Sequence, residues 1–297
     1  AAVGAVAGAA SLGWAVHEAR QYTLRTATVP CLQSGAPSVR VLHLSDLHFT
    51  PQQRDKADWL QALADLRPDL TVVTGDFLAH HAAVNPVLDA LGPLLQGPGL
   101  FVLGSNDYYE PHLKNPLAYL AGPSELGADR PMLPWGDLVS GLVLAGWHDL
   151  DNAETSLRLG GLTIDARGVD DPHIGRDDYA AVAGPFDPAA DLRLGVAHAP
   201  YLRVLDRMDA DGVDLILAGH THGGQVCLPG GRALVTNCDI DTGRAKGLHR
   251  HREGQVFASD RPEGAWLHVS AGLGTSPHAP IRFFCRPEAT LLTLTAP

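Results

Sequence analysis

The chain has 297 residues, of which 45% are hydrophobic, and its formal net charge is −11 at pH 7. This length and composition allow a sizeable core in one large domain or two ordinary ones. The acidic balance and the absence of a long basic run argue against a surface that binds nucleic acid by neutralising phosphates, so we expect no nucleic-acid partner. An anionic substrate is compatible with the sequence, because bound metal ions can supply positive charge locally.

The first 37 residues differ from the rest in composition. Residues 1–16 are apolar and uncharged, but they are fewer than the about 20 residues that span a bilayer as a helix. We interpret residues 1–37 as an apolar N-terminal segment, a membrane anchor or signal remnant, followed by a linker, and residues 38–297 as one domain. This interpretation predicts a membrane-associated protein, with the side that it faces left open. In the alternative, the segment is an Ala-rich helix packed on the domain of a cytoplasmic protein.

Three segments in the first third of the chain read as buried strands that end in polar residues. Their expected ranges are 39–48, 69–76 and 99–107. Residues 54–66 and 86–95, which follow the first two strands, are expected to be helical because of their apolar spacing and the prolines at their boundaries. This repeat of strand, polar turn and helix is typical of βα units stacked around a sheet. Ligands in such folds bind at the carboxyl ends of the strands.

The second half of the chain repeats the strand and polar turn twice, at residues 191–198 and 213–222. Between the halves, residues 110–137 are rich in Pro, Gly and polar residues and are expected to form a long surface loop or cap. The tail alternates in short segments such as 281–284 and 290–294, which predicts mostly antiparallel strands that complete a second sheet. We therefore predict an α/β fold, a two-sheet α/β sandwich flanked by helices.

The four cysteines, Cys31, Cys227, Cys238 and Cys285, include no C-x-x-C pair. A zinc ribbon or a thioredoxin-like motif is therefore not indicated. We expect free, partly buried thiols, with a Cys227–Cys238 bridge across a hairpin as the alternative.

Side chains able to bind metal follow all five predicted strands. They are Asp46 and His48, Asp76, Ser105 to Asp107, His198, and His220 with His222. Taken singly, a strand-end Asp is more often a helix cap, and a lone His is more often a satisfied polar residue. Coincidence does not account for five such turns in order, each after a buried strand. Carboxylate, amide and imidazole together suit borderline divalent ions such as Mn, Fe or Zn.

Five short motifs carry a resemblance to a known family. "SDLH", "TGD", "GSND", "AH" and "GHTHGGQ" resemble the motifs of the calcineurin-like metallophosphoesterase superfamily, over roughly residues 38 to 295. Residues 168–178 and 270–288 also resemble the bacterial membrane-associated branch of that family.

The resemblance implies a centre of two divalent metal ions. The first ion would be held by Asp46, His48, Asp76 and His222. The second would be held by Asp76, His198, His220 and Asn106. A hydroxide that bridges the ions would attack phosphorus, with Asp76, Asn106 and His198 as the catalytic residues. Behind the ligands, His43 and Asp107 are expected to act as supports.

The third motif departs from the family pattern G-N-H-D, in which the Asn binds metal and the His is thought to protonate the leaving oxygen. Here Ser105 and Asn106 stand at those places. We favour a shifted turn in which the Asn106 amide oxygen reaches the metal; in the alternative, Ser105 or a water takes that place. The proton donor is then unassigned, and His80, His81 or His173 could replace it. Without a donor, anhydrides or aryl-like esters are expected to react better than simple alkyl phosphates.

The sequence thus predicts a dinuclear metal-dependent hydrolase of phosphate esters that acts on phosphodiester or pyrophosphate bonds. Its partner would be a phosphorylated small molecule or, if the N-terminal segment is an anchor, a lipid-linked or cell-envelope phosphate. The alternative is a metal-binding scaffold of the same fold with lost or weak turnover, because the third-motif His is missing. Intact D-x-H and G-H-x-H motifs argue against a scaffold, since it need not keep both metal sites.

Overall fold

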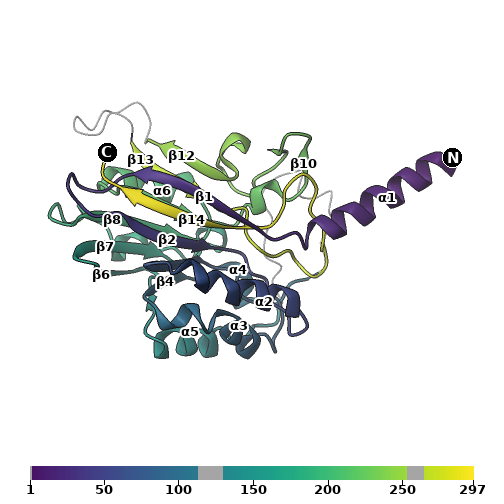
Figure 1. Ribbon diagram of the computed structural model, residues 1–297, viewed down its shortest axis with the longest axis horizontal. Helices are drawn as coiled ribbons and strands as arrows, with labels where there is room; N and C mark the ends of the chain where they lie inside the picture. The colour runs from purple at the N-terminus through teal and green to yellow at the C-terminus, as the bar shows by residue number, and fades with distance from the viewer. Residues whose placement is uncertain (1, 113–129, 253–263) are drawn as a thin grey trace.

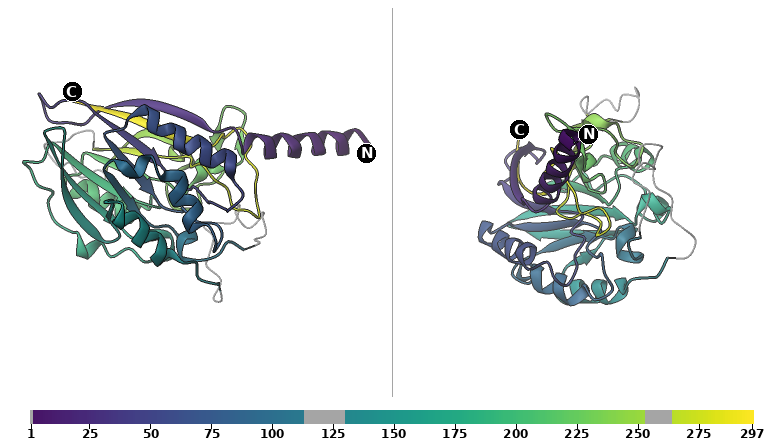
Figure 2. Two further views of the ribbon diagram at one scale, coloured as in Figure 1. Left: turned by 60° about the horizontal axis from the view of Figure 1, so that its bottom comes forward. Right: turned by 90° about the vertical axis from the view of Figure 1, so that its right-hand side faces the viewer.

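The structure is a computed structural model that describes residues 2–112, 130–252 and 264–297. Two six-stranded sheets pack face to face, and helices cover their outer faces (Figure 1 and Figure 2). The predicted two-sheet α/β sandwich flanked by helices is therefore confirmed. Most of the loop expected at 110–137 lies outside the described residues.

The first sheet has the strand order β1-β14-β2-β3-β4-β5. The strands are β1 (Thr23–Pro30), β14 (Glu288–Thr295), β2 (Val39–Leu44), β3 (Leu70–Thr74), β4 (Gly99–Val102) and β5 (His148–Asp149). Strands β2 to β5 run parallel, as βα units require, whereas β14 is antiparallel to β2 and parallel to β1. The carboxyl ends of β2, β3 and β4 therefore lie side by side.

The second sheet has the order β12-β13-β9-β8-β7-β6, and β10 and β11 form a separate hairpin. The strands are β6 (Ala153–Leu159), β7 (Leu162–Val169), β8 (Leu192–Ala197), β9 (Leu215–Ala218), β10 (Cys227–Leu228), β11 (Arg232–Ala233), β12 (Gly247–His251) and β13 (Ala265–Val269). The four central strands β7, β8, β9 and β13 are parallel, and the edge strands β6 and β12 are antiparallel to their neighbours. The carboxyl ends of β8 and β9 are therefore adjacent.

Three apolar layers form the core. One lies between the two sheets, and the other two lie between a sheet and its helices. The helices of the sandwich are α2 (Arg54–Ala62), α3 (Val84–Leu91), α4 (Ser105–Tyr108), α5 (Trp135–Leu144) and α6 (Leu202–Ala210). In β2, Leu42 and Leu44 pack in the layer with α2, α3 and α5, whereas Val41 packs between the sheets, because successive side chains of a strand point to opposite faces. On the other side, Leu205 of α6 packs with Ile216 of the second sheet.

Two parts of the chain occupy places in the sheets that the sequence pattern did not predict. Strand β1 lies within residues 1–37, which we had set apart from the domain, and it pairs with β14 along its whole length. The prediction of an antiparallel tail that completes a second sheet is confirmed in part, since β13 lies in the second sheet and pairs antiparallel with β12. It is wrong for the rest, because β13 runs parallel to β9 and β14 joins the first sheet. Residues 281–284 form one isolated bridge, at Phe283, instead of a strand. Alternating apolar residues report which face of a strand is buried, not which strand it pairs with.

Helix α1 (Ala2–Glu18) projects from the sandwich (Figure 1). Its last turn is tied to the body, because the Arg282 N–H donates to the Ala15 carbonyl and the Cys285 N–H donates to the Glu18 carboxylate. No helix in the described ranges has both the length and the apolar character needed to cross a membrane.

Candidate metal centre

The predicted ligands lie where the strand ends of the two sheets meet. Asp46 follows β2, Asp76 follows β3, His198 follows β8, and His220 follows β9. The chain continues the pairing of β2 and β3 beyond both strands, since the Asp46 N–H donates to the Gly75 carbonyl at 3.0 Å. This extension holds the first two motifs side by side.

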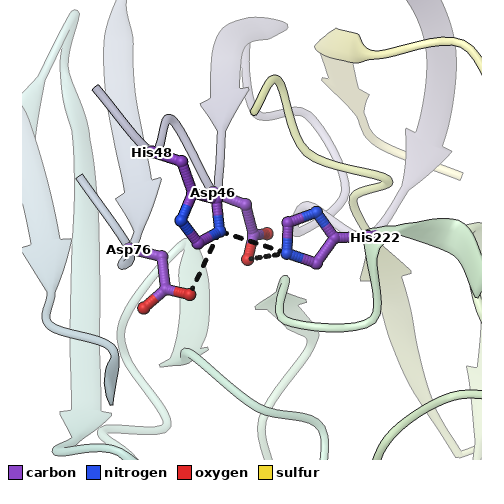
Figure 3. A group of neighbouring side chains, drawn as sticks. All are labelled: Asp46, His48, Asp76 and His222. Atoms are coloured by element: carbon purple, nitrogen blue, oxygen red, sulfur yellow. Dashed lines mark hydrogen bonds and ion pairs between the residues drawn. The ribbon is translucent and has the colours of Figure 1, made fainter. Parts of the chain in front are cut away.

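Four of the predicted ligands form a compact group, which we call the four-residue cluster: Asp46, His48, Asp76 and His222. One ligand atom from each lies within 4.8 Å of the other three (Figure 3). Nε2 of His48 is 3.1 Å from Nε2 of His222 and 3.4 Å from Oδ2 of Asp76. Nε2 of His222 is 3.5 Å from Oδ1 of Asp46. Atoms that bind one ion at about 2.1 Å lie about 3.0–3.4 Å from each other, so the cluster has the spacing of a metal site.

All four cluster residues have a left-handed backbone conformation, with φ between 42° and 54°. Non-glycine residues seldom occupy this region, and those that do concentrate at functional sites. The side chains of Ser45 and Asp46 also lie so close to the backbone at position 219 that only glycine fits there. A Cβ on Gly219 would overlap Oγ of Ser45 and lie 2.7 Å from Oδ2 of Asp46. The local backbone is therefore shaped by the demand that these side chains converge.

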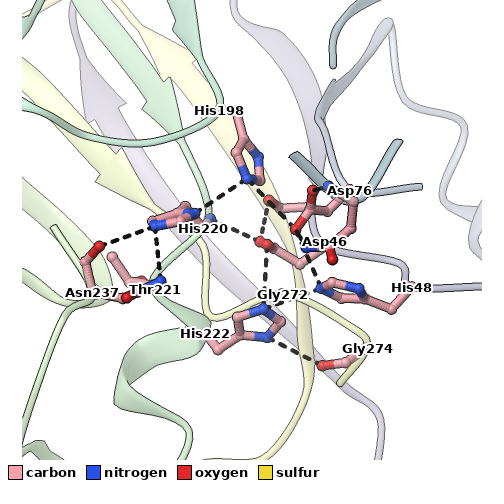
Figure 4. Close-up of polar contacts among 12 residues, drawn as sticks. Asp46, His48, Asp76, His198, His220, Thr221, His222, Asn237, Gly272 and Gly274 are labelled. Carbon is pink, nitrogen blue, oxygen red and sulfur yellow. Dashed lines mark hydrogen bonds and ion pairs between the residues drawn. The ribbon is translucent and has the colours of Figure 1, made fainter. Parts of the chain in front are cut away.

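A second group adjoins the cluster at Asp76 (Figure 4). Nε2 of His198 lies 3.6 Å from Oδ2 of Asp76 and 3.3 Å from Nδ1 of His220. The side-chain amide of Asn106 donates to Oδ2 of Asp76 at 2.7 Å, and its N–H donates to Oδ1 at 2.8 Å. Ser105 is buried, and its Oγ lies 3.5 Å from the Asn106 amide nitrogen. Asn106 thus places its side chain against the carboxylate that both groups share.

Backbone carbonyls accept hydrogen bonds from three of the imidazoles. The pairs are His198 Nδ1 with Thr74 O at 2.7 Å, His220 Nε2 with Asn237 O at 3.2 Å, and His222 Nδ1 with Gly274 O at 3.3 Å. A carbonyl acceptor favours a proton on the nitrogen that it contacts, and in a neutral ring the other nitrogen then presents its lone pair. Nε2 of His220 and Nδ1 of His222 each also lie 3.3 Å from a donor, the Asn237 amide nitrogen and the Arg282 guanidinium respectively. In each of the three rings, the nitrogen that does not contact the carbonyl faces a second predicted ligand.

Burial dominates the electrostatics of three cluster residues, whereas at Asp76 the effect of burial is outweighed by the nearby His198 and His48, which lower the pKa to about 2. Burial raises the pKa of Asp46 to about 6, lowers the pKa of His48 to about 4, and holds the pKa of His222 well below its ordinary value. The two histidines are therefore neutral, which is the form that binds metal. His198 differs, because burial opposes its protonation but the nearby Asp76 carboxylate raises its pKa to about 10. A cation bound beside these carboxylates would supply the charge that the proton on His198 now provides.

Two buried atoms of the cluster, Oδ1 of Asp46 and Nδ1 of His48, have no hydrogen-bond partner among the described residues. A buried carboxylate oxygen without a partner is costly. Because Oδ1 of Asp46 points toward Nε2 of His222 (Figure 3), a divalent cation within the cluster would satisfy it. Two carboxylates and two imidazoles fit the ligand preference of Mn, Fe or Zn.

His43, expected behind the ligands, is fully buried and reaches Asp46 through two hydroxyl groups. Its Nε2 lies 3.0 Å from Oγ1 of Thr74, which donates to Oγ of Ser45 at 2.8 Å. Ser45 in turn donates to Oδ2 of Asp46 at 2.5 Å. On its other side, Nδ1 of His43 lies 2.8 Å from Nδ1 of His268 in the second sheet. This chain of contacts links both sheets to one ligand, and only its first member was expected from the sequence.

Asp107, the other expected support, accepts the N–H groups of Leu78 and Gly104, each at 3.0 Å. These residues belong to the turns that follow β3 and β4. Asp107 therefore fixes the third motif against the second and contacts neither of their predicted metal ligands.

Arg282 was missed by the sequence reasoning. It is fully buried, and its guanidinium donates to the carbonyls of His222 at 3.0 Å, Ala271 at 2.7 Å, Gly272 at 3.1 Å and Gly274 at 2.7 Å. The arginine thus binds the backbone of one cluster residue and of the segment after β13. An arginine inside the apolar run "PIRFF" was the available signal, since a charged side chain there needs buried partners.

The three histidines considered as proton donors lie in different places. His80 and His81 follow β3 and stack on each other, with ring centroids 4.3 Å apart. His173 lies in a short 3₁₀ turn after β7, and its ring centroid is 4.4 Å from that of His220. Of the three, His173 is thus the one whose ring packs against that of a predicted ligand, His220.

The family model of the calcineurin-like phosphoesterases matches residues 39–224. The chain belongs to this family. The phosphoesterase is 26% identical over 301 residues to the uncharacterized protein YpbG of Bacillus subtilis (strain 168), covering 98% of this chain and 97% of the relative. It is 24% identical over 313 residues to the uncharacterized metallophosphoesterase YkuE of the same strain, covering 99% and 93%. Among solved structures, purple acid phosphatase PPD1 of yellow lupin (Lupinus luteus) is similar with a TM-score of 0.41 and 12% identity, covering 64% of this chain and 39% of that one.

The phosphoesterase is accordingly a metal-dependent hydrolase of phosphorylated substrates. Its family uses divalent metal ions, and the four-residue cluster is a group able to hold one. The fold and the site together therefore explain why polar residues follow so many of its buried strands.

Proposed function

We propose that this phosphoesterase hydrolyses phosphodiester or pyrophosphate bonds at a centre of two divalent cations that share Asp76. The observation that carries the proposal is the position of Asp76 Oδ2, which lies 3.4 Å from Nε2 of His48 and 3.6 Å from Nε2 of His198. The four-residue cluster would hold one cation. Asp76, His198, His220 and Asn106 would hold the other.

The bound cations would supply positive charge at the phosphoryl oxygens and a water of lowered pKa. The protein's own part is positioning, because Asn106 fixes Asp76 through two hydrogen bonds and Ser45 fixes Asp46. Two divalent cations bring four positive charges and the carboxylates of Asp46 and Asp76 remove two, so the centre stays cationic. A site of that charge favours a phosphate over a neutral ester.

For proton transfer, we propose that His173 protonates the leaving oxygen in place of the family's third-motif His. The amide of Asn106 cannot do so, and it is already bound to Asp76. His173 is partly exposed and packs beside His220, so a substrate at the second cation can reach it. Its Nδ1 lies 3.1 Å from the hydroxyl of Tyr201, and its backbone N–H donates to Asp171 at 2.8 Å. The first contact orients the ring, and the second fixes the backbone that carries it.

A leaving-group series tests both parts of this proposal. Hydrolysis of aryl and alkyl phosphodiesters is measured with added Mn²⁺, for the wild type and for His173→Ala. The wild type should show a shallow dependence on leaving-group pKa, whereas His173→Ala should lose about 10²–10⁴-fold on alkyl esters and little on the most acidic aryl esters. His81→Ala, an exposed histidine outside the centre, is the matched control.

Three outcomes would contradict the proposal in different ways. If the wild-type rate depended on leaving-group pKa as steeply as the His173→Ala rate, His173 would not be a proton donor. The preference for anhydrides and aryl-like esters that the third motif suggests would then remain. If His173→Ala lost the same factor in rate on all esters, His173 would have only a structural role. A protein that binds metal and hydrolyses none of the esters would be the scaffold of the alternative hypothesis.

For location, we propose that α1 rests on a membrane surface and that the substrate is a lipid-linked or cell-envelope phosphate, as in the membrane-associated branch of the family. Support comes from the projection of α1 away from the sandwich (Figure 1) and from Leu12 and Trp14, which are 58% and 47% exposed. Sedimentation with phosphatidylcholine vesicles should carry the wild type down and leave a Leu12→Ser, Trp14→Ser variant in solution. If the wild type also stays in solution, the proposed contact of α1 with a membrane surface is wrong.

A further inference from the structure

Two cysteines from distant parts of the sequence meet at the backbone of the metal-binding loop. Cys227 begins β10, Cys285 precedes β14, and both are free thiols. A bridge between Cys227 and Cys238 is not present, and Cys238 packs in a different apolar cluster. The sequence offered no reason to pair Cys227 with Cys285, because 57 residues separate them.

The two thiols share their contacts as well as their location. Each sulfur lies near the carbonyl oxygen of Gly223, at 3.1 Å for Cys227 and 3.5 Å for Cys285, and both residues belong to one buried apolar cluster. The Cys227 N–H also donates to the Phe283 carbonyl at 2.8 Å, which holds the two chain segments side by side. The two sulfurs therefore lie beside the same backbone oxygen, on chain segments that are hydrogen-bonded to each other.

The same thiols touch the segment that carries a predicted metal ligand. Sγ of Cys285 lies 3.3 Å from the His222 carbonyl oxygen. Packing at the next residue is close, since a Cβ on Gly223 would lie 2.8 Å from Sγ of Cys285 and 2.9 Å from Cδ of Lys246. Any movement of the Cys285 sulfur is thus transmitted to the backbone of His222 and Gly223.

Cys285 is 2% exposed and has charged neighbours of both signs, since the Glu18 carboxylate accepts its backbone N–H. It lines a cavity of about 450 Å³ whose walls include Trp14, Arg25, Lys246 and Phe284. Nζ of Lys246 lies 3.4 Å from its sulfur. Cationic side chains beside a thiol favour its reaction with oxidants, because they stabilise the sulfur anion that reacts.

We propose that Cys227 and Cys285 form a reversible disulfide when a hydroperoxide enters this cavity, and that the disulfide weakens metal binding at His222. The first half is independent of the proposed function, and the second half rests on it. The sulfur of Cys285 attacks one oxygen of the hydroperoxide, the O–O bond breaks, and water or an alcohol leaves, so that Cys285 becomes a sulfenic acid. The sulfur of Cys227 then displaces that oxygen as a second water. Two thiols lose two electrons, and one hydroperoxide gains them.

Mass spectrometry of the full chain tests the first half. Treatment with a small excess of hydrogen peroxide should lower the mass by about 2 Da, with a peptide that joins residues 227 and 285, and dithiothreitol should restore the original mass. Cys227→Ser and Cys285→Ser should each abolish this change, while Cys31→Ser, a substitution outside the pair, should keep it. A cross-link to Cys238, or no cross-link in the wild type, would overturn the pairing.

Metal affinity tests the second half without any substrate. Mn²⁺ or Zn²⁺ binding is measured by titration calorimetry on the reduced and the oxidised protein. Oxidation should weaken binding about tenfold, the scale seen when groups that support a metal ligand are disturbed, and dithiothreitol should reverse the loss. Cys227→Ala, checked for folding by circular dichroism, should bind equally well before and after peroxide. An oxidised wild type with unchanged affinity would overturn the link to His222, whereas a reduced protein that binds no metal would instead refute the proposed function.

Discussion

The four-residue cluster and the histidine pair formed by His198 and His220 are built in different ways. In the histidine pair, His198 Nδ1 contacts the Thr74 carbonyl at 2.7 Å and His220 Nε2 contacts the Asn237 carbonyl at 3.2 Å. In the cluster, all four residues have positive φ values, and two buried atoms have no hydrogen-bond partner within the described residues. Protein contacts hold the rings of the histidine pair in place, although His220 also has a positive φ of 68°. The cluster combines four such backbone conformations with unmet polar atoms.

The difference indicates that the four-residue cluster depends more on a bound cation than the histidine pair does. A strained backbone with unsatisfied polar atoms persists when something else stabilises it, and in the cluster a divalent cation would do so. In the histidine pair, a backbone carbonyl already contacts one nitrogen of each ring. Removing metal should therefore disturb the cluster more than the pair, and the following experiments test that statement.

The largest effect is expected from Asp76→Asn, because Asp76 is the proposed ligand that the two cations share. Loss of the shared negative ligand should lower kcat/KM by about 10³-fold, corresponding to about 4 kcal/mol of transition-state stabilisation. Metal analysis should find both ions depleted. Asp58→Asn, on the exposed face of α2, is the matched control, and an Asp76→Asn protein with full metal content would contradict a shared ligand.

Two single substitutions should separate the halves. His222→Ala should leave the cation of the histidine pair, and His220→Ala should leave the cation of the cluster, so that each variant keeps one ion and loses about 10²-fold in activity. Metal content and kcat/KM are measured on the same samples. If either variant retains two ions, its histidine is not a ligand. If either loses both ions, the two halves do not bind independently.

Metal removal should act locally. Ligand binding at about 100 times Kd stabilises a protein by about 2.7 kcal/mol, so chelation should lower Tm by about 5 °C in a chain of this size. Hydrogen exchange should then accelerate at residues 46–48 and 222–224 and change little at residues 195–198. Uniform acceleration across all three segments would show that the two halves respond alike, contrary to the comparison.

The smallest effect is expected from Ser45→Ala, which removes the hydrogen bond between Ser45 and Oδ2 of Asp46. One such bond contributes about 1 kcal/mol, or about fivefold in metal affinity. Titration with Mn²⁺ measures the loss, and Ser140→Ala on the exposed face of α5 provides the control. An unchanged affinity would mean that the His220 N–H, which also donates to Oδ2 of Asp46, positions this carboxylate alone.

Much of the site could be predicted because its signals are local. Each ligand stands just after an apolar run, and the carboxyl ends of parallel strands meet at one edge of a sheet. The proximity of Asp46, His48 and Asp76 follows from that rule once the strands are recognised, whereas the place of His222, after a strand of the second sheet, was implied by the family resemblance. By contrast, the sequence alone could not choose among His80, His81 and His173, because only the packing of the turn after β7 brings His173 to the ring of His220.

The sequence by itself determined the βα repeats, the sandwich class and the chemical character of the centre, since hydrophobic period and motif residues are properties of short segments. Tertiary structure alone decided that β1 and β14 pair, that Arg282 binds the carbonyl of His222, and that Cys285 meets Cys227. These contacts join residues far apart in the chain. Their formation depends on how whole sheets and loops pack, and no local pattern of residue types records that information.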